Sequence, residues 1–318
     1  MVSPHSLTGR GNSVESEDYV SHRLLDPGLE LADLTVKLQA INRLSLRDRF
    51  HSAMFLPAGS LLESAAAQIS EEISGAVEVN GEAADFETVI GTIENGQVNH
   101  GILFECEPSL VVIKRPEALP VDVLKAVESV LSTGEYTLSR NGTHTTLQSP
   151  ASILCLSSPV NGCFENEVPL LEQVECPPQL LSAAGLVVAD SPCIELESEY
   201  LSSDQLVPDE GPYTSSVDEP QFSNHAECEI KVTVKADENS GRFCGEPPYR
   251  PHSAITDKQQ AYQTMRKLAA GFARFREENH VDDSPHATSA RFLNWELQDR
   301  INRIQLKSKS TDELSLLR

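Results

Sequence analysis

Two acidic residues that follow a short apolar run are the first candidates for chemistry in this chain. Residues 102–104 (Ile-Leu-Phe) lead into Glu105, Cys106 and Glu107. In a nucleotide-hydrolysing site, a buried strand ends in Asp-Glu, where the Asp supports the Mg²⁺ shell and the Glu polarises the attacking water. Glu107 stands where the catalytic acid belongs, but Cys106 replaces the Asp, and a soft thiol is a poor partner for magnesium. Glu105 does not substitute, since successive side chains of a strand point to opposite faces. The pattern predicts a vestigial site that has lost hydrolysis.

A loop earlier in the chain lies where such a site would bind phosphate. Residues 55–62 read Phe-Leu-Pro-Ala-Gly-Ser-Leu-Leu, between a predicted strand and a predicted helix. A phosphate-binding loop needs several glycines and a Lys-Ser/Thr pair. This loop is short, contains one glycine and lacks lysine. The pattern therefore favours an ordinary strand-to-helix turn, with Gly59 and Ser60 as vestigial nucleotide-binding candidates.

A predicted hairpin carries a candidate contact to nucleic acid. The alternating runs 135–139 and 143–148 are joined through Arg140, Asn141 and Gly142, and Asn-Gly between such runs is a strong hairpin signal. Arg140 at the tip could contact a nucleic-acid backbone. An exposed tip residue without a role fits the sequence equally well.

The elements that must position these residues follow from periodicity and turn signals. Apolar spacing predicts helices over 31–44, 61–73 and 120–131. Strands are predicted over 53–56, 76–79, 86–93, 102–104, 153–156 and 186–189. Strands that alternate with helices favour an α/β fold with a mainly parallel sheet.

Composition limits the possible functions. A net charge of −23 opposes a broad electrostatic grip on DNA, so any DNA contact would be local or supplied by partners. The seven cysteines form no CxxC pair, which predicts reduced core thiols in an intracellular protein rather than a metal site. The N-terminus lacks a signal-peptide pattern, and no stretch approaches the roughly 20 apolar residues that span a bilayer. We expect a soluble protein with no membrane role.

The chain divides into four predicted regions. Residues 1–28 form a disordered tail and residues 29–194 the core. Residues 195–250 hold thirteen acids against four bases, which is typical of an acidic disordered linker or insertion, in which 229–235 could form a short strand. Residues 251–318 contain two helical stretches, 261–279 and 290–306, which together could form a C-terminal lid.

Several landmarks in the same order give the chain its resemblance to a known family. The segment 128–164 is similar to the helix, presensor hairpin and sensor strand of the MCM family, the hexameric replicative helicases with an AAA+ P-loop-type domain. Residues 177–182 (Pro-Pro-Gln-Leu-Leu-Ser) resemble the motif before the family's arginine finger. Residues 289–293 (Ser-Ala-Arg-Phe-Leu) resemble the start of its sensor-2 helix. The resemblance implies an AAA+ parallel sheet flanked by helices, with a C-terminal helical lid.

The resemblance also implies that most active positions are lost. No lysine accompanies Gly59, Ser158 stands for the sensor asparagine, and Ala183 stands for the arginine finger. Only Glu107 and Arg291 match the family, while Arg140 keeps the charge of the hairpin lysine.

Three functions follow from these observations. The favoured one is a catalytically inactive MCM-like subunit or scaffold in DNA replication or meiotic recombination, acting through contacts with MCM-type or recombination proteins. A nuclear location follows from the resemblance alone. The alternatives are an ATP-dependent helicase subunit with a nonstandard nucleotide site, which would need ATP and Mg²⁺, and a truncated paralogue without independent activity. The favoured function requires no cofactor.

Overall fold

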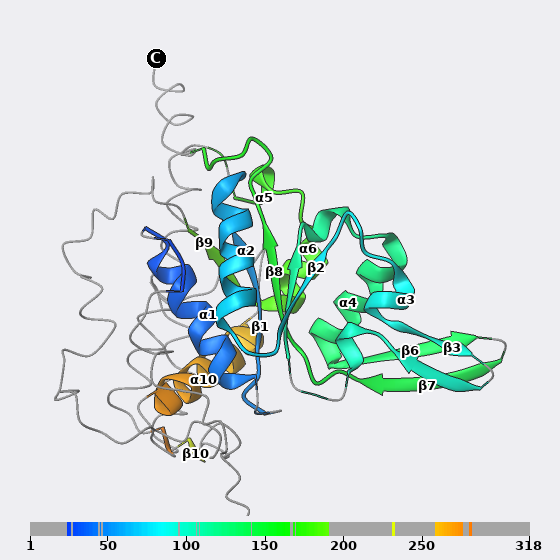
Figure 1. Ribbon diagram of the computed structural model, residues 1–318. Coiled ribbons are helices and arrows are strands. Elements are labelled where there is room, and N and C mark those ends of the chain that lie inside the picture. Colours follow the sequence, from blue (N-terminus) through cyan, green and yellow to red (C-terminus); the bar gives the residue numbers. More distant parts are fainter. Residues whose placement is uncertain are drawn as a thin grey trace, which may run out of the picture.

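A parallel sheet of five strands forms the centre of the molecule (Figure 1). The computed structural model describes residues 24–26, 28–43, 45, 47–94, 96–105, 107, 109–140, 142–165, 168, 170–190, 231–232, 258–275 and 280–281. In spatial order, the strands are β2 (Ala76–Asn80), β5 (Leu110–Lys114), β8 (Ser152–Ser157), β1 (His51–Phe55) and β9 (Gly185–Ala189). All neighbouring pairs are parallel, which confirms the predicted α/β fold with a mainly parallel sheet.

Helices cover both faces of this sheet, because its inner strands alternate between two apolar cores. Met54 and Leu154 point into the core beneath α1 (Glu30–Asn42), α2 (Ser60–Glu72) and α10 (Lys258–Phe275). Phe55 and Ile153 point into the opposite core, beneath α3 (Phe86–Val89), α4 (Val121–Thr133) and α6 (Pro178–Ala184). The inner strands are buried on both sides, which is why β8 has the nearly continuous apolar sequence Ser-Ile-Leu-Cys-Leu-Ser.

The start of α1 depends on a residue from the last strand. Leu29 precedes this helix and has no side chain that can cap it. The buried carboxylate of Asp190, directly after β9, instead accepts the backbone N–H groups of Leu31 and Ala32 at 3.1 and 3.0 Å. A carboxylate at this position satisfies free N–H groups and interacts favourably with the helix dipole.

Two antiparallel hairpins extend together from one side of the sheet (Figure 1). The first joins β3 (Gly91–Glu94) to β4 (Gln97–His100), and the second joins β6 (Glu135–Arg140) to β7 (Thr143–Gln148). The second hairpin confirms the prediction from Asn-Gly. Phe86 and Tyr136 meet edge to face with ring centroids 6.2 Å apart, and the Arg140 guanidinium donates to the Thr92 hydroxyl. The hairpins therefore support each other through defined contacts.

Two strand predictions were wrong. Residues 86–93 form the short helix α3 followed by β3, because the Asp85 side chain accepts the Thr88 N–H and caps a helical turn. Residues 102–104 form a 3₁₀ turn, η1 (Ile102–Phe104), rather than a buried strand. The buried strand that pairs with β8 is β5, eight residues farther along the chain.

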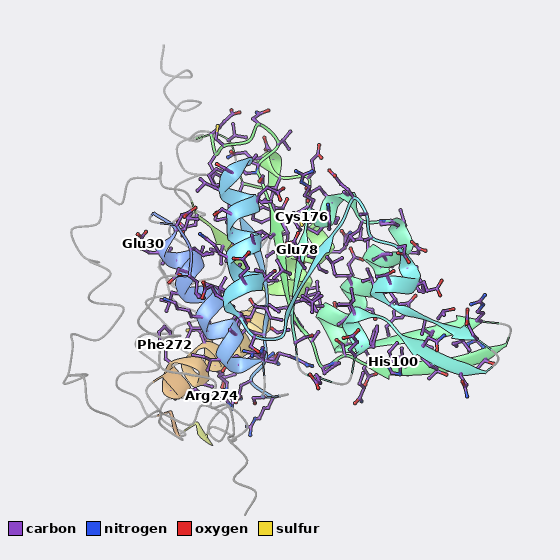
Figure 2. The ribbon with its side chains drawn as sticks, in the orientation of Figure 1. Glu30, Glu78, His100, Cys176, Phe272 and Arg274 are labelled. Carbon is purple, nitrogen blue, oxygen red and sulfur yellow. The ribbon has the colours of Figure 1, made fainter. Side chains whose placement is uncertain are left out.

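The C-terminal part is described over α10 and a small parallel pair, β10 (Lys231–Val232) and β11 (His280–Val281). The helix predicted over 261–279 is thus confirmed for most of its length, and it packs against α1 and β9. Arg274 near its end, labelled in Figure 2, is buried. Its guanidinium donates to Asn42 and Asp48. The helix predicted over 290–306, most of the acidic region 195–250 and residues 1–23 of the predicted tail 1–28 lie outside the described residues, whereas Leu24 and Leu25 from the end of that tail are buried in the core.

Replacing Gly81 with alanine is expected to destabilise the fold markedly. A Cβ on Gly81 would lie 2.1 Å from the carbonyl oxygen of Arg115, so the backbone after β2 or β5 would have to move. Overpacking of this kind costs about 1–3 kcal/mol or more. Gly96 is the matched control, because its Cβ would meet no atom within 4 Å and only its positive φ of 79° is strained. Urea denaturation should show a larger loss for Gly81→Ala than for Gly96→Ala, and equal losses would contradict the packing argument.

Candidate functional site at the carboxyl edge of the sheet

The crevice between the carboxyl ends of β1 and β8 is the best candidate for a ligand site in this topology. The helix after β1 is α2, which lies on one face of the sheet. The helical segments after β8, α5 (Leu170–Gln173) and α6, belong to the core on the other face. Neighbouring strands whose connections leave to opposite faces open a crevice at their carboxyl ends, where open α/β sheets bind ligands. Gly59, Ser60 and Ser158 follow the carboxyl ends of these two strands.

Backbone N–H groups of the loop between β1 and α2 are used in hydrogen bonds within the protein. The N–H of Leu56 donates to the carbonyl of Ser157 at 3.0 Å, and the N–H of Ala58 donates to the carbonyl of Gly162 at 2.7 Å. Pro57 has no N–H. A phosphate cradle requires several backbone N–H groups directed at one anion. This loop keeps Gly59 exposed at the start of α2, but its preceding donors are occupied or absent.

The end of β5 brings two basic residues to the same edge of the sheet. Lys114 is the last residue of β5 and Arg115 follows it. Among the residues that the structure describes, Arg115 is the one non-glycine with positive φ, at 55°, and its N–H donates to the carbonyl of Leu156 at 2.8 Å. The hydrogen bond to Leu156 of β8 therefore holds the backbone of Arg115 in its strained conformation. Neither residue is among the candidates predicted from the sequence. The apolar run 110–113 directly before Lys-Arg-Pro-Glu could have indicated a buried strand that ends beside them.

Acidic side chains of neighbouring elements neutralise these two cations. The Lys114 ammonium lies 2.6 Å from a carboxylate oxygen of Glu63 and 2.8 Å from one of Glu78. These hydrogen bonds, first to Glu63 and then to Glu78, raise the pKa of Lys114. Arg115 pairs with Glu82 and more distantly with Glu63, and the hydrogen bond to Glu82 raises the pKa of Arg115. The edge is therefore a closed network of ion pairs in which Glu63 links α2 to the end of β5.

The acidic residues proposed from the sequence lie elsewhere. Glu105 and Glu107 are exposed and come before β5, at the opposite, amino edge of the sheet from Gly59. Their predicted place at the end of a buried strand was wrong, because residues 102–104 form η1. The structure thus does not bring Glu107 together with Gly59 and Ser60. Cys106 lies outside the described residues.

The other proposed residues are also separated in space. The Ser158 hydroxyl is buried beside the crevice and has no hydrogen-bond partner. Ala183 is on α6 and lines a cavity at the amino edge of the sheet. Arg140 is on the hairpin, exposed, with its guanidinium bonded to Thr92. Arg291 lies outside the described residues.

The described part of the chain also contains free thiols. Three cysteines in the described part of the chain are free, and of these Cys155 and Cys176 are buried. Burial raises the pKa of Cys176 to about 12 and holds that of Cys155 well above its usual value, so both are inert thiols in the core. Within the described ranges, no cluster of three His, Cys, Asp or Glu side chains could hold a metal ion. None of the helices described there is long and apolar enough to cross a membrane.

The fold defines the class of this protein as an α/β protein with a five-stranded parallel sheet and helices on both faces. Neither a protein-family model nor a curated protein matches the chain.

Proposed function

We propose that this chain is a catalytically inactive MCM-like subunit or scaffold. In this proposal it takes part in nuclear complexes of DNA replication or meiotic recombination, and it acts through contacts with MCM-type or recombination proteins. The observation that carries the inactive character is the end of β5, where Lys114 and Arg115 stand beside the candidate crevice. The parallel sheet, the strand-turn-helix at Gly59 and the paired hairpins support the AAA+ part of the proposal.

The charge at the end of β5 argues against a nucleotide cycle. A nucleotide-hydrolysing site places carboxylates beside the phosphates, where they hold hydrated Mg²⁺ and activate water. Here the same edge carries an ammonium and a guanidinium, and the carboxylates of Glu63, Glu78 and Glu82 are already in ion pairs with them. The carboxylate of Glu117 at this edge accepts from the Ser157 hydroxyl at 2.8 Å. A divalent cation bound by the three paired carboxylates would have to break their ion pairs, and at this edge it is repelled by two positive charges. The network fits a structural role better than a catalytic one.

A nucleotide titration tests this proposal. Isothermal titration calorimetry of the full chain with ATP, with and without Mg²⁺, is expected to show no saturable heat. The occupied N–H of Ala58, the missing lysine and the Lys114–Arg115 pair all oppose binding. Saturable binding of ATP with one site per chain would contradict the inactive assignment. Partner capture from nuclear extract tests the other half, and recovery of no MCM-type or recombination protein would contradict the scaffold role.

The runner-up is a helicase or ATPase subunit with a nonstandard nucleotide site. One observation favours it: space is open around Gly59 at the start of α2, and the buried hydroxyl of Ser158, which follows the neighbouring strand β8, has no hydrogen-bond partner. The same titration decides between the two functions. In either case DNA would be reached indirectly or through Arg140. The third candidate, a truncated paralogue, predicts that residues 29–318 do not unfold cooperatively when followed by circular dichroism.

A further inference from the structure

A second cavity lies at the amino edge of the sheet, on the opposite side from the crevice. It has a volume of about 670 Å³ and is bounded by the starts of β1 and β9, the end of α4, α6 and α10. A volume of this size accommodates a small organic molecule. Thr264 of α10 donates to the carbonyl of Gly185 at 3.3 Å, which fixes one wall to the first residue of β9. The proposed function uses none of these residues in catalysis.

Basic groups gather at this cavity in a chain that is strongly acidic overall. Lys267 and His51 line it, and Arg49 lies close enough to both to lower the pKa of each. Burial is the larger cause of the lowered pKa of Lys267, followed by the charge of Arg49. Asp48, the acid nearest to Lys267, already accepts from the buried Arg274. Within the described part of the chain, no carboxylate forms an ion pair with Lys267. The site therefore keeps an excess of positive charge.

Two further polar groups contribute to the site, one as a donor and one through its charge. The Nδ1 atom of His51 accepts the N–H of Ile153 at 3.0 Å, and burial lowers the pKa of this imidazole to about 3. The ring is therefore neutral at physiological pH and carries its proton on Nε2, which is a hydrogen-bond donor. One Nη atom of Arg49 donates to the carbonyl of Ser149 at 2.8 Å, while its other Nη is buried without a partner. A buried cationic donor without an acceptor is costly. Arg49 does not line the cavity, so it acts on a bound anion through its charge.

The remaining walls limit the shape of the ligand. Phe50, Leu131 and Pro178 supply an apolar side, while Gln179 and Gln263 add amide groups. One end of the ligand must therefore carry negative charge, and its body must be apolar. The charge of Lys267 in the lining and that of the nearby Arg49 favour a dianion over a monoanion, and a phosphate monoester carries about −1.5 to −2 charges near neutral pH.

The geometry points to a binding site for a small phosphomonoester in this cavity, with its phosphate held by Lys267 and His51 near the positive charge of Arg49, and its organic part against Phe50, Leu131 and Pro178. The site is independent of the proposed function, since it lies at the other edge of the sheet and requires no nucleotide cycle.

Titration calorimetry with phenyl phosphate tests the site in the full chain. We expect saturable binding with one site, weaker binding of inorganic phosphate, which lacks the apolar body, and weaker binding of benzoate, which lacks the second charge. Lys267→Gln should weaken phenyl phosphate binding at least tenfold, because it removes a charge-assisted hydrogen bond. Lys125→Gln removes an exposed lysine of α4 that does not line the cavity and should leave the affinity unchanged.

A second variant separates a shaped site from general attraction of anions. Ala183→Leu keeps every charge but fills part of the cavity, so it should also weaken binding by at least tenfold. Thermal unfolding of each variant checks that it is folded. The proposal is overturned if phenyl phosphate does not bind, if benzoate binds as tightly, if Lys125→Gln weakens binding as much as Lys267→Gln, or if folded Ala183→Leu binds normally.

Discussion

Replacement of Asp48 by alanine is expected to lower the free energy of unfolding by about 3–5 kcal/mol, since it breaks the ion pair of a buried guanidinium. Arg274 on α10 is 2% exposed, and its Nη2 donates to Asp48 at 2.5 Å. Asn42 of α1 accepts from Nη1 but carries no charge that could replace Asp48. Urea denaturation followed by circular dichroism measures the change.

Two control variants identify the cause of the expected loss. Glu82→Ala breaks the exposed ion pair with Arg115, and pairs of that kind contribute about 0–1 kcal/mol. The double variant Asp48→Leu with Arg274→Met removes both buried charges and should recover most of the stability lost in Asp48→Ala. If the double variant is no more stable than Asp48→Ala, or if Glu82→Ala is equally harmful, the loss does not arise from an unpaired buried charge.

The second large effect is a dependence of stability on pH that arises at His51. Burial, followed by the charges of Arg49 and Lys267, lowers the pKa of folded His51 to about 3, while an unfolded histidine titrates near 6.5. Below pH 6.5 the unfolded chain therefore binds a proton that the folded chain excludes. The contribution of neutral His51 is complete above pH 6.5 and is lost as the pH falls toward 3, by about 1.4 kcal/mol per pH unit.

The variant His51→Gln isolates this contribution from the titration of the many carboxylates. The difference in unfolding free energy between the wild type and His51→Gln should change by about 1.4 kcal/mol per pH unit between pH 6 and pH 4. His144→Gln is the matched control, because His144 is exposed on β7. If the plots of unfolding free energy against pH for the wild type and His51→Gln stay parallel over this range, His51 is not the group whose protonation is excluded in the folded state.

The sequence predicted the elements that have a clear apolar pattern or are bounded by distinctive turn residues. The helices α2 and α4, the β6–β7 hairpin and the strands β1, β8 and β9 lie close to their predicted ranges. The strand β5 was missed because Leu110–Lys114 is a short apolar run without alternation, and such runs do not distinguish a strand from other buried segments. The apolar residues 102–104 were predicted to be the buried strand instead.

Only those residues of the candidate site that adjoin strands with a clear sequence pattern could be predicted. Gly59 and Ser158 are placed by the strands β1 and β8, which periodicity identifies, and both follow the carboxyl ends that bound the crevice. Lys114 and Arg115 could not be assigned to that crevice before β5 was known, since their position depends on pairing with a strand about forty residues away. The cationic cavity depends on α10 approaching β9, a long-range contact that no local pattern encodes.

The cap that Asp190 provides for α1 has a consequence for how the chain folds during synthesis. The donors at Leu31 and Ala32 precede their acceptor by 159 and 158 residues. At a translation rate of about 5–20 residues per second, the first helix leaves the ribosome roughly 8–30 s before its cap is made. The strand β1 also waits for its neighbour β9, since its partner residues, such as Gly185 for His51, come 134 positions later in the chain. Folding therefore has a high contact order, and the finished core forms only once β9 has been synthesised.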